Sequence, residues 1–152
     1  ENDINLLCYG SLAGGFLTEY WLEKPDPGFM FENRSLIKYR LIIDEFGGWD
    51  LFQTLLKTVK VIADKHVVSM TAVAVRYVLD QPQVAAVIIG ARYAHHLSQT
   101  LSIFELSLDP DDYAVLEAVL DQSHGPSGYV YELESDSTGR HGRIMKYNLN
   151  AL

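Results

Sequence analysis

Cysteine, positive charge and long apolar runs are all scarce in this chain of 152 residues. Its single cysteine, Cys8, cannot form an internal disulfide, which favours a reducing cytoplasmic setting over secretion. No apolar run reaches the roughly 18 residues of a membrane span, and nothing resembles a signal peptide. The 12 Lys and Arg against 20 Asp and Glu give a formal net charge of −8, which argues against a nucleic-acid partner or an anionic membrane surface.

Composition and histidine placement set further limits. With 48% hydrophobic and 21% charged residues, the chain has the make-up of one ordinary globular domain. Cys8 lies in the apolar run of residues 4–9, where we expect a buried structural thiol rather than a nucleophile. His95 and His96 are adjacent, so on a helix they point about 100° apart and do not share one metal ion. We therefore expect no metal site. The remaining histidines are isolated and are expected in solvent: His66, His124 and His141.

Two segments predict short strands that end in glycine turns. Residues 84–89 are apolar at nearly every position, which is typical of a strand covered on both faces, and Gly90 follows them. Residues 4–9 indicate another strand. The segment behind it, residues 10–15, contains three glycines that allow a tight turn or the close approach of a ligand.

A helix is predicted over residues 93–101, directly after the turn at Gly90. Unpaired N–H groups and the helix dipole at its start attract an anion, and Arg92 and His96 add positive charge there. Its apolar stripe, which is expected to pack inward, consists of Leu97, Leu101 and Phe104. These features outline a phosphate site.

The middle of the chain predicts a loop followed by two helices. Residues 23–48 contain Pro and Gly near both ends, which indicates an ordered functional loop. Apolar residues at helical spacing predict a helix over residues 49–65. Ser69 is a plausible cap for a further helix over residues 70–80.

The last predicted helix begins at residues 109–112, whose sequence Asp-Pro-Asp-Asp supplies a capping carboxylate, Pro in the first position and acid in the first turn. We place a boundary after this helix. Residues 1–122 form the structured part, and residues 123–152 form a surface tail that is partly ordered.

Alternating strands and helices predict an α/β fold with parallel strands joined by crossover helices. Two parallel strands leave both edges and an apolar face open, so further strands or a partner must cover them. A (β/α)₈ TIM barrel has about 250 residues and often binds phosphate in the loops after its last two strands. We therefore interpret the chain as the C-terminal part of such a barrel, its last two strands with their helices, incomplete as a barrel. The first residue is not Met, which favours a truncated product.

Several blocks of sequence resemble the aldo-keto reductase family. Residues 9–18 are similar to its seventh-strand motif, in which Tyr, a small residue, a variable residue and Leu precede a Gly-Leu-Leu-Thr-like run. Residues 73–92 resemble its last crossover helix, eighth strand and cofactor loop, and residues 108–112 resemble the start of its final helix. The resemblance covers residues 4–122. It implies a (β/α)₈ barrel that transfers hydride between a nicotinamide cofactor, usually NADPH, and a carbonyl or alcohol.

The resemblance also implies where NADP binds. The expected positions are Tyr9 against the nicotinamide ring; Gly10, Leu12 and Gly14 along the pyrophosphate; Gly90, Ala91 and Arg92 at the 2′-phosphate and adenine; and His96, Gln99 and Thr100 on the same helical face. Arg suits this place because its guanidinium pairs with phosphate and stacks on adenine. Two positions depart from the family: Thr100 stands where many members have Asn, and His96 where some have Arg.

The catalytic residues that the resemblance implies are absent from this sequence. The family places an Asp, a Tyr, a Lys and a His on the first half of the barrel, and no motif here matches them. Lys38 and Tyr39, with Asp44 nearby, do not replace them, because adjacent residues in a loop lack the convergent geometry of proton transfer. We therefore expect no catalytic residue in the chain, and no turnover of carbonyls by the chain alone.

Aromatic residues near the predicted loop and in the tail have further expected roles. Phe29, Phe31 and Trp49 flank the loop where the apolar wall of the family's substrate pocket is expected. Tyr129 and Tyr131 either cover the active site or attach the tail to the barrel, and we favour attachment.

Three functions of different class stay open. We favour a fragment of an NADP-dependent aldo-keto reductase whose complete form reduces an aldehyde, a ketone or a sugar. The alternatives are a catalytically silent nucleotide-binding module and a structural fragment that self-associates through exposed barrel edges. The expected partner of the complete protein is a small-molecule carbonyl or alcohol substrate, with no nucleic acid and no membrane.

Overall fold

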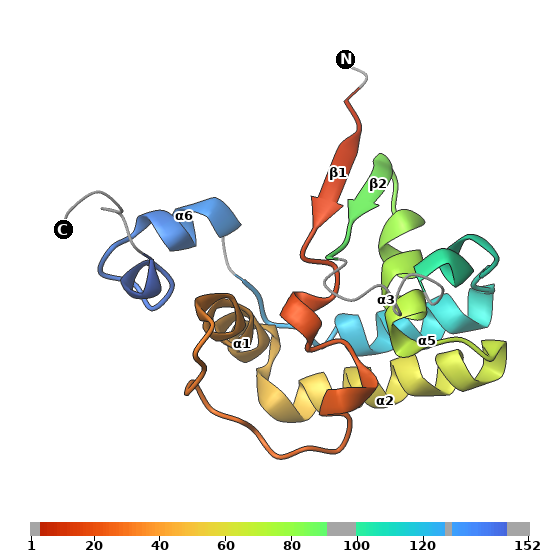
Figure 1. Cartoon of the computed structure of the whole chain (residues 1–152), viewed down its shortest axis with the longest axis horizontal. Coiled ribbons are helices and arrows are strands. Elements are labelled where there is room, and N and C mark those ends of the chain that lie inside the picture. Colours follow the sequence, from red (N-terminus) through yellow and green to blue (C-terminus); the bar gives the residue numbers. More distant parts are fainter. Residues whose placement is uncertain (1–3, 91–99, 127–128, 146–152) are drawn as a thin grey trace.

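The computed structural model describes residues 4–90, 100–126 and 129–145. In chain order, its strands and α-helices are β1 (Leu6–Tyr9), α1 (Arg34–Phe46), α2 (Gly48–His66), α3 (Met70–Leu79), β2 (Val84–Ile88), α5 (Pro110–Leu120) and α6 (Val130–Ser135) (Figure 1). Single turns of 3-10 helix lie at Ala13–Gly15, Glu19–Trp21, Ser102–Phe104 and Gly142–Ile144. None of the helices in these segments has both the length and the apolar character needed to cross a membrane.

The two strands β1 and β2 pair in parallel, as the sequence predicts. Leu6 lies opposite Val84, and Tyr9 lies opposite Ile88. The prediction that the second strand is covered on both faces is wrong, since its side chains are half-buried or exposed and Ile88 is 58% exposed. Cys8 is likewise half-buried rather than buried. The reason is that no further strand pairs with β1 or β2 in the described segments, and the pair projects beyond the helices (Figure 1).

Helices α2 and α3 form where the apolar spacing predicts them. The buried side chains of α2 recur on one stripe, which includes Phe52, Leu56, Val59, Ile62 and Ala63. The N-terminus of α3 is capped by Ser69, whose Oγ accepts a hydrogen bond from the N–H of Ala72 at 3.2 Å. This bond satisfies one of the N–H groups that a helix start leaves unpaired.

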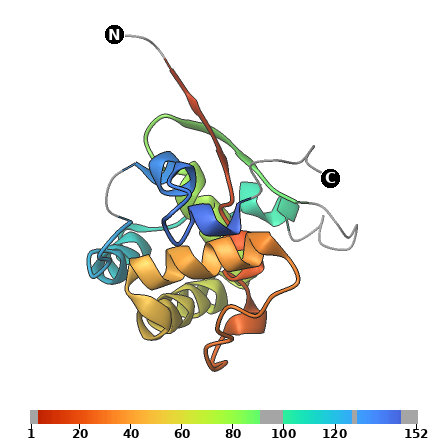
Figure 2. The same ribbon diagram turned by 90° about the vertical axis from the view of Figure 1, so that its left-hand side faces the viewer.

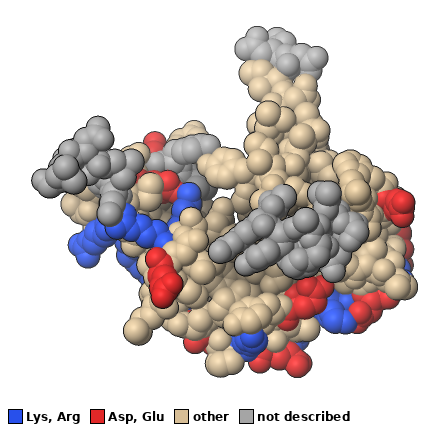
Figure 3. Space-filling model, viewed as in Figure 1, with Lys and Arg blue, Asp and Glu red and all other residues tan. Residues whose placement is uncertain are grey.

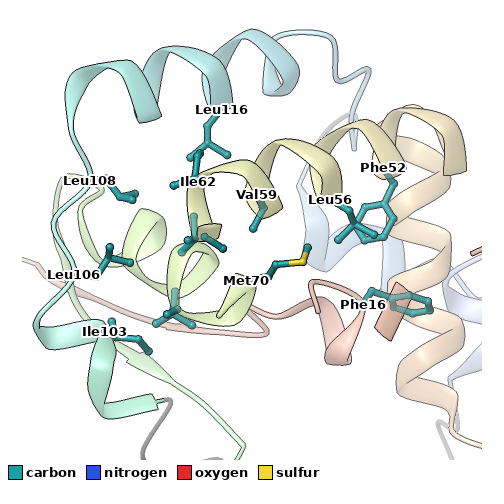
Figure 4. Close-up of a cluster of buried hydrophobic side chains, with 14 of the residues drawn as sticks. Phe16, Phe52, Leu56, Val59, Ile62, Met70, Ile103, Leu106, Leu108 and Leu116 are labelled. Carbon is teal, nitrogen blue, oxygen red and sulfur yellow. The ribbon is translucent and has the colours of Figure 1, made fainter. Parts of the chain in front are cut away.

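The hydrophobic core lies between α2, α3 and α5 and extends to Phe16 in the segment after β1 (Figure 4). Phe16 is fully buried. The rings of Trp21, Phe31, Trp49 and Phe52 surround it at centroid distances of 4.8 to 6.3 Å. Aromatic packing thus fixes the segment that follows β1 against the first turns of α2.

The segment of residues 23–48, predicted as a loop, contains helix α1. Asn33 caps this helix, because its Oδ1 accepts a hydrogen bond from the N–H of Ser35 at 2.8 Å. Leu41 and Ile43 are buried at 5% and 3% exposure. The loop prediction was wrong here because the Pro and Gly residues that indicated it lie on either side of the helix and leave its interior free of both.

The described part of the tail contains α6 and a 3-10 turn and packs against α1. Figures 1 and 2 show α6 and the 142–144 turn beside α1, and the turn contacts both helices. Side-chain contacts join tail and helix at three places: Lys38 with Glu134, Asp44 with Arg140 at 2.7 Å, and Glu45 with His141 at 2.6 Å. His141 is buried at 4% exposure, so the expectation that it lies in solvent is wrong. The boundary after residue 122 stays a prediction.

The start of α5 carries the predicted cap in full. Asp109 accepts hydrogen bonds from the N–H groups of Asp111 and Asp112, and Asp112 Oδ2 accepts the N–H of Asp109 at 3.0 Å. His66, at the end of α2, lies 2.7 Å from Asp112 through its Nε2. It is only 20% exposed, so the expectation that it lies in solvent is wrong as well. His124 is exposed, as expected.

Most of the helix predicted over residues 93–101 lies outside the described residues. The prediction that its apolar stripe packs inward is wrong for the two described residues, because Leu101 is 56% and Phe104 76% exposed. Ile103, at 3% exposure, is buried in their place. Ile103 lies in a 3-10 turn over residues 102–104.

Candidate functional site

The glycine turns that follow β1 and β2 meet in one cavity of about 360 Å³. Parallel neighbours end at the same edge of a sheet, so the residues after Tyr9 and after Ile88 leave the strands side by side. The residues around this cavity include Gly10, Leu12, Gly14, Tyr39 and Gly90. The two segments that the sequence singles out therefore form one surface.

A neighbouring cavity of about 380 Å³ shares Leu12 and Gly90 with the first. Thr100 lines it, together with Thr18 and Glu19. Glu19 also supports the helix beside it, since its Oε1 accepts the N–H of Met70 at 2.7 Å. The two cavities together offer an elongated site along the ends of the strands.

We call residues 10–15 the glycine loop. Its backbone is held in a tight turn by hydrogen bonds from Ala13 N–H to Gly10 O and from Gly15 N–H to Leu12 O, both 2.8 Å. Gly10 and Gly14 have φ of +72° and +65°, which glycine adopts without strain. The Oγ of Ser11 is buried in this loop and has no hydrogen-bond partner among the described residues.

The predicted cofactor residues fall into three groups. Five of them line the two cavities: Gly10, Leu12, Gly14, Gly90 and Thr100. Tyr9 lies at the end of β1, is 62% exposed and does not line either cavity. Four fall outside the described residues: Ala91, Arg92, His96 and Gln99.

Few charged side chains line the two cavities. No Lys or Arg lines the two cavities in the described part of the chain, and Glu19 is the acid there. Lys38 precedes Tyr39, which lines the first cavity. Burial works against the charge of Lys38, but Glu134 outweighs it and raises the pKa of the ammonium group, with smaller help from Tyr9 and Tyr39.

Tyr39 is the residue that sequence reasoning missed. It appeared there only as a poor catalytic candidate in a loop, whereas α1 places its ring against Gly10 and Gly14. The available signal was helical spacing, since Leu36, Tyr39 and Ile43 recur at intervals of three and four residues.

The aromatic residues expected to wall a substrate pocket serve other purposes. Trp49 is buried at 8% exposure, and its Nε1 donates a hydrogen bond to the carbonyl of Lys24 at 2.8 Å. Phe31 packs edge-on against the core, and Phe29 lies 5.1 Å from the guanidinium of Arg40. None of the three lines the two cavities, and their place at the wall of a substrate pocket stays a prediction.

A group of potential metal ligands lies between the end of α2 and the start of α5. His66, Asp109 and Asp112 each offer an atom within 4.8 Å of the others. Lys65 donates to both carboxylates, however, and backbone N–H groups take further lone pairs. The donor set is that of an ion-pair cluster that joins two helices.

A comparison with protein-family models matches residues 1–121 to the aldo/keto reductase family. The comparison with individual curated proteins gave no match. The matched residues include both strands, both cavities and all of α5.

Proposed function

This chain belongs to the aldo/keto reductase family, whose members are oxidoreductases that use nicotinamide cofactors, and from that membership we propose that it carries the NADP(H)-binding loops of such an enzyme. When bound, the reduced cofactor would donate a hydride to a carbonyl, and the oxidised cofactor would accept one from an alcohol. The substrate class of the complete protein is an aldehyde, a ketone or a sugar.

The observation that carries this proposal is the meeting of two glycine segments at one edge of the sheet. Gly10, Leu12 and Gly14 face Gly90 across a single cavity. Ligands of α/β proteins bind outside the carboxyl ends of parallel strands, where N–H groups and small residues allow close approach.

Each part of the cofactor has an assigned place in this proposal. The pyrophosphate lies along the glycine loop, and the nicotinamide lies against Tyr9. The adenosine end lies near Thr100 in the neighbouring cavity. Because no Lys or Arg lines the cavities in the described segments, Arg92 and His96 supply the positive charge for the 2′-phosphate.

We place the chain at the C-terminal end of a barrel whose earlier strands carry the catalytic Asp, Tyr, Lys and His. The exposed sheet supports this placement, since Leu6, Leu7 and Ile88 are 48%, 64% and 58% exposed. Figure 3 shows that the projecting strands carry no charged side chain on the face in view. In a barrel, neighbouring strands cover such a surface.

A second copy of the chain is the competing occupant of this surface. Self-association through the open strand edges predicts a dimer or larger species whose population rises with concentration. Light scattering with size-exclusion chromatography measures this directly. A monomer at all concentrations removes self-association from the proposal.

The cofactor assignment is tested by titrating the chain with NADPH and NADH while following tryptophan and tyrosine fluorescence. Arg92→Ala should weaken NADPH binding by roughly 1–3 kcal/mol, as for a lost hydrogen bond to a charged group, and leave NADH binding nearly unchanged. Arg143→Ala, in the exposed tail, is the matched control and should change neither. No fluorescence change with NADPH at millimolar concentration, or an equal loss for both cofactors, contradicts the assignment.

A further inference from the structure

We propose that Tyr39 is a positioning residue for the glycine loop and that its ring, packed beneath Gly10 and Gly14, sets the shape of the loop that binds the cofactor. The statement about the cofactor rests on the proposed function. The statement about the loop rests on the packing alone.

The ring of Tyr39 occupies the space that a side chain would need at both glycines. A methyl group added to Gly14 would lie 2.6 Å from Cδ2 of Tyr39, closer than real contacts allow. One added to Gly10 would meet the hydroxyl oxygen of Tyr39 first and would lie 3.2 Å from its Cζ. These glycines therefore meet two demands at once, a positive φ and contact with an aromatic ring.

Other glycines with positive φ lack this second demand. A methyl group added to Gly28 or Gly15 would meet nothing within 4 Å. Gly28 has the same φ as Gly14, +65°. The chain thus contains a matched pair of glycines that differ in the contact with Tyr39.

The backbone that carries Tyr39 is held on both sides. Lys38 pairs with Glu134 of the tail. Arg40 is 3% exposed, and its Nε donates a hydrogen bond to Asp26 Oδ1 at 2.9 Å, while its guanidinium also pairs with Asp44. Because the neighbours of Tyr39 are fixed, its ring is a firm support rather than a surface side chain that moves away.

The support matters because the ring and the loop line the same cavity. Tyr39 forms one wall, and Gly10, Leu12 and Gly90 form others. If the ring is removed, the glycine loop loses its packing partner, and its backbone can shift into the space that the ring occupied. The peptide groups that face the cofactor then move with it.

The packing is tested by a double-mutant cycle on the full chain, with thermal unfolding followed by circular dichroism. Gly14→Ala should lower the melting temperature by roughly 5 °C more than Gly28→Ala, because only the first meets the ring. In a Tyr39→Ala background the two glycine substitutions should cost the same. If Tyr39→Ala does not fold, Tyr39→Val serves, since it also removes the ring. Equal costs in the wild-type background, or a gap that persists without the ring, overturn the proposal.

The effect on the cofactor is tested by NADPH titration of the folded variants. Tyr39→Ala should raise the Kd at least tenfold, and Tyr39→Phe, which keeps the ring, should stay within about twofold of the wild type. Leu41→Ala is the control. It removes a buried side chain of the same helix, and therefore destabilises α1, but Leu41 does not line the cavity. A Kd for Tyr39→Ala equal to that of Leu41→Ala contradicts positioning. If the wild-type chain binds no NADPH, the proposed function and the cofactor statement fail, while the glycine cycle still decides the role of Tyr39 in the loop.

Discussion

Asp112 joins two helices and offers the sharpest test of the physical account. It is 2% exposed, and its carboxylate accepts hydrogen bonds from Lys65 at 2.8 Å and from the N–H of Asp109 at 3.0 Å. Lys65 donates to Oδ1, whereas the N–H of Asp109 and His66 Nε2, at 2.7 Å, both contact Oδ2. The carboxylate therefore ties the end of α2 to the start of α5.

The contribution of Asp112 to the free energy of unfolding follows from the pKa of its carboxyl group. Burial alone would raise the pKa of Asp112, but Lys65, the N–H of Asp109 and His66 outweigh it and lower the pKa from 3.8 to about 2. Each unit is worth about 1.4 kcal/mol, so the ionised carboxylate contributes about 2.5 kcal/mol to stability. Because the pKa is lowered in the folded chain, this contribution is present at neutral pH and is lost as the pH falls from about 5 to 2.

Urea unfolding of the wild type and of Asp112→Asn, followed by tryptophan fluorescence at pH values from 7 to 2, measures this contribution. At pH 7 the variant should be less stable by about 2.5 kcal/mol, and the difference should shrink as the pH approaches 2. Asp111→Asn is the matched control, because Asp111 is exposed in the same helical turn. A difference that stays constant with pH, or a cost no larger than that of Asp111→Asn, would refute the reasoning.

Three further substitutions test other parts of the fold. Phe16→Ala should cost about 3–5 kcal/mol in urea unfolding, because it empties a fully buried site; a cost below 1 kcal/mol would contradict the aromatic core. Ser69→Ala should cost about 1 kcal/mol in the same assay, since it removes the cap of α3, and Ser69→Thr should restore most of it. His141→Ala should speed hydrogen exchange in residues 129–145, because it removes the bond to Glu45, and unchanged exchange there would show that the tail is held by other contacts.

The helices that the sequence predicts well are those with local signals at their ends. Ser69 and residues 109–112 mark helix starts through hydrogen bonds within one turn, and these caps form as predicted. Helix α1 has one such signal, its cap Asn33. Its stability comes from long-range contacts, such as Arg40 with Asp26, which no local pattern shows.

In the candidate site, too, the local features can be predicted from the sequence, whereas the long-range contacts cannot. Strand ends followed by glycine turns are local features, and the parallel pairing of β1 and β2 brings Gly10 and Gly90 to one cavity. Tyr39 reaches that cavity from a separate helix. His66 and His141 acquire partners 46 and 96 residues away along the chain, so their burial could not be predicted from their neighbours in the sequence.

The central claim is that the two glycine turns form one nucleotide site, and hydrogen exchange with NADPH tests it most directly. Exchange of the chain is measured by mass spectrometry with and without saturating NADPH. We expect slower exchange in residues 10–15 and in residues 86–90 together, because both segments line the same cavity. Protection of one segment alone, or of neither, would contradict the claim.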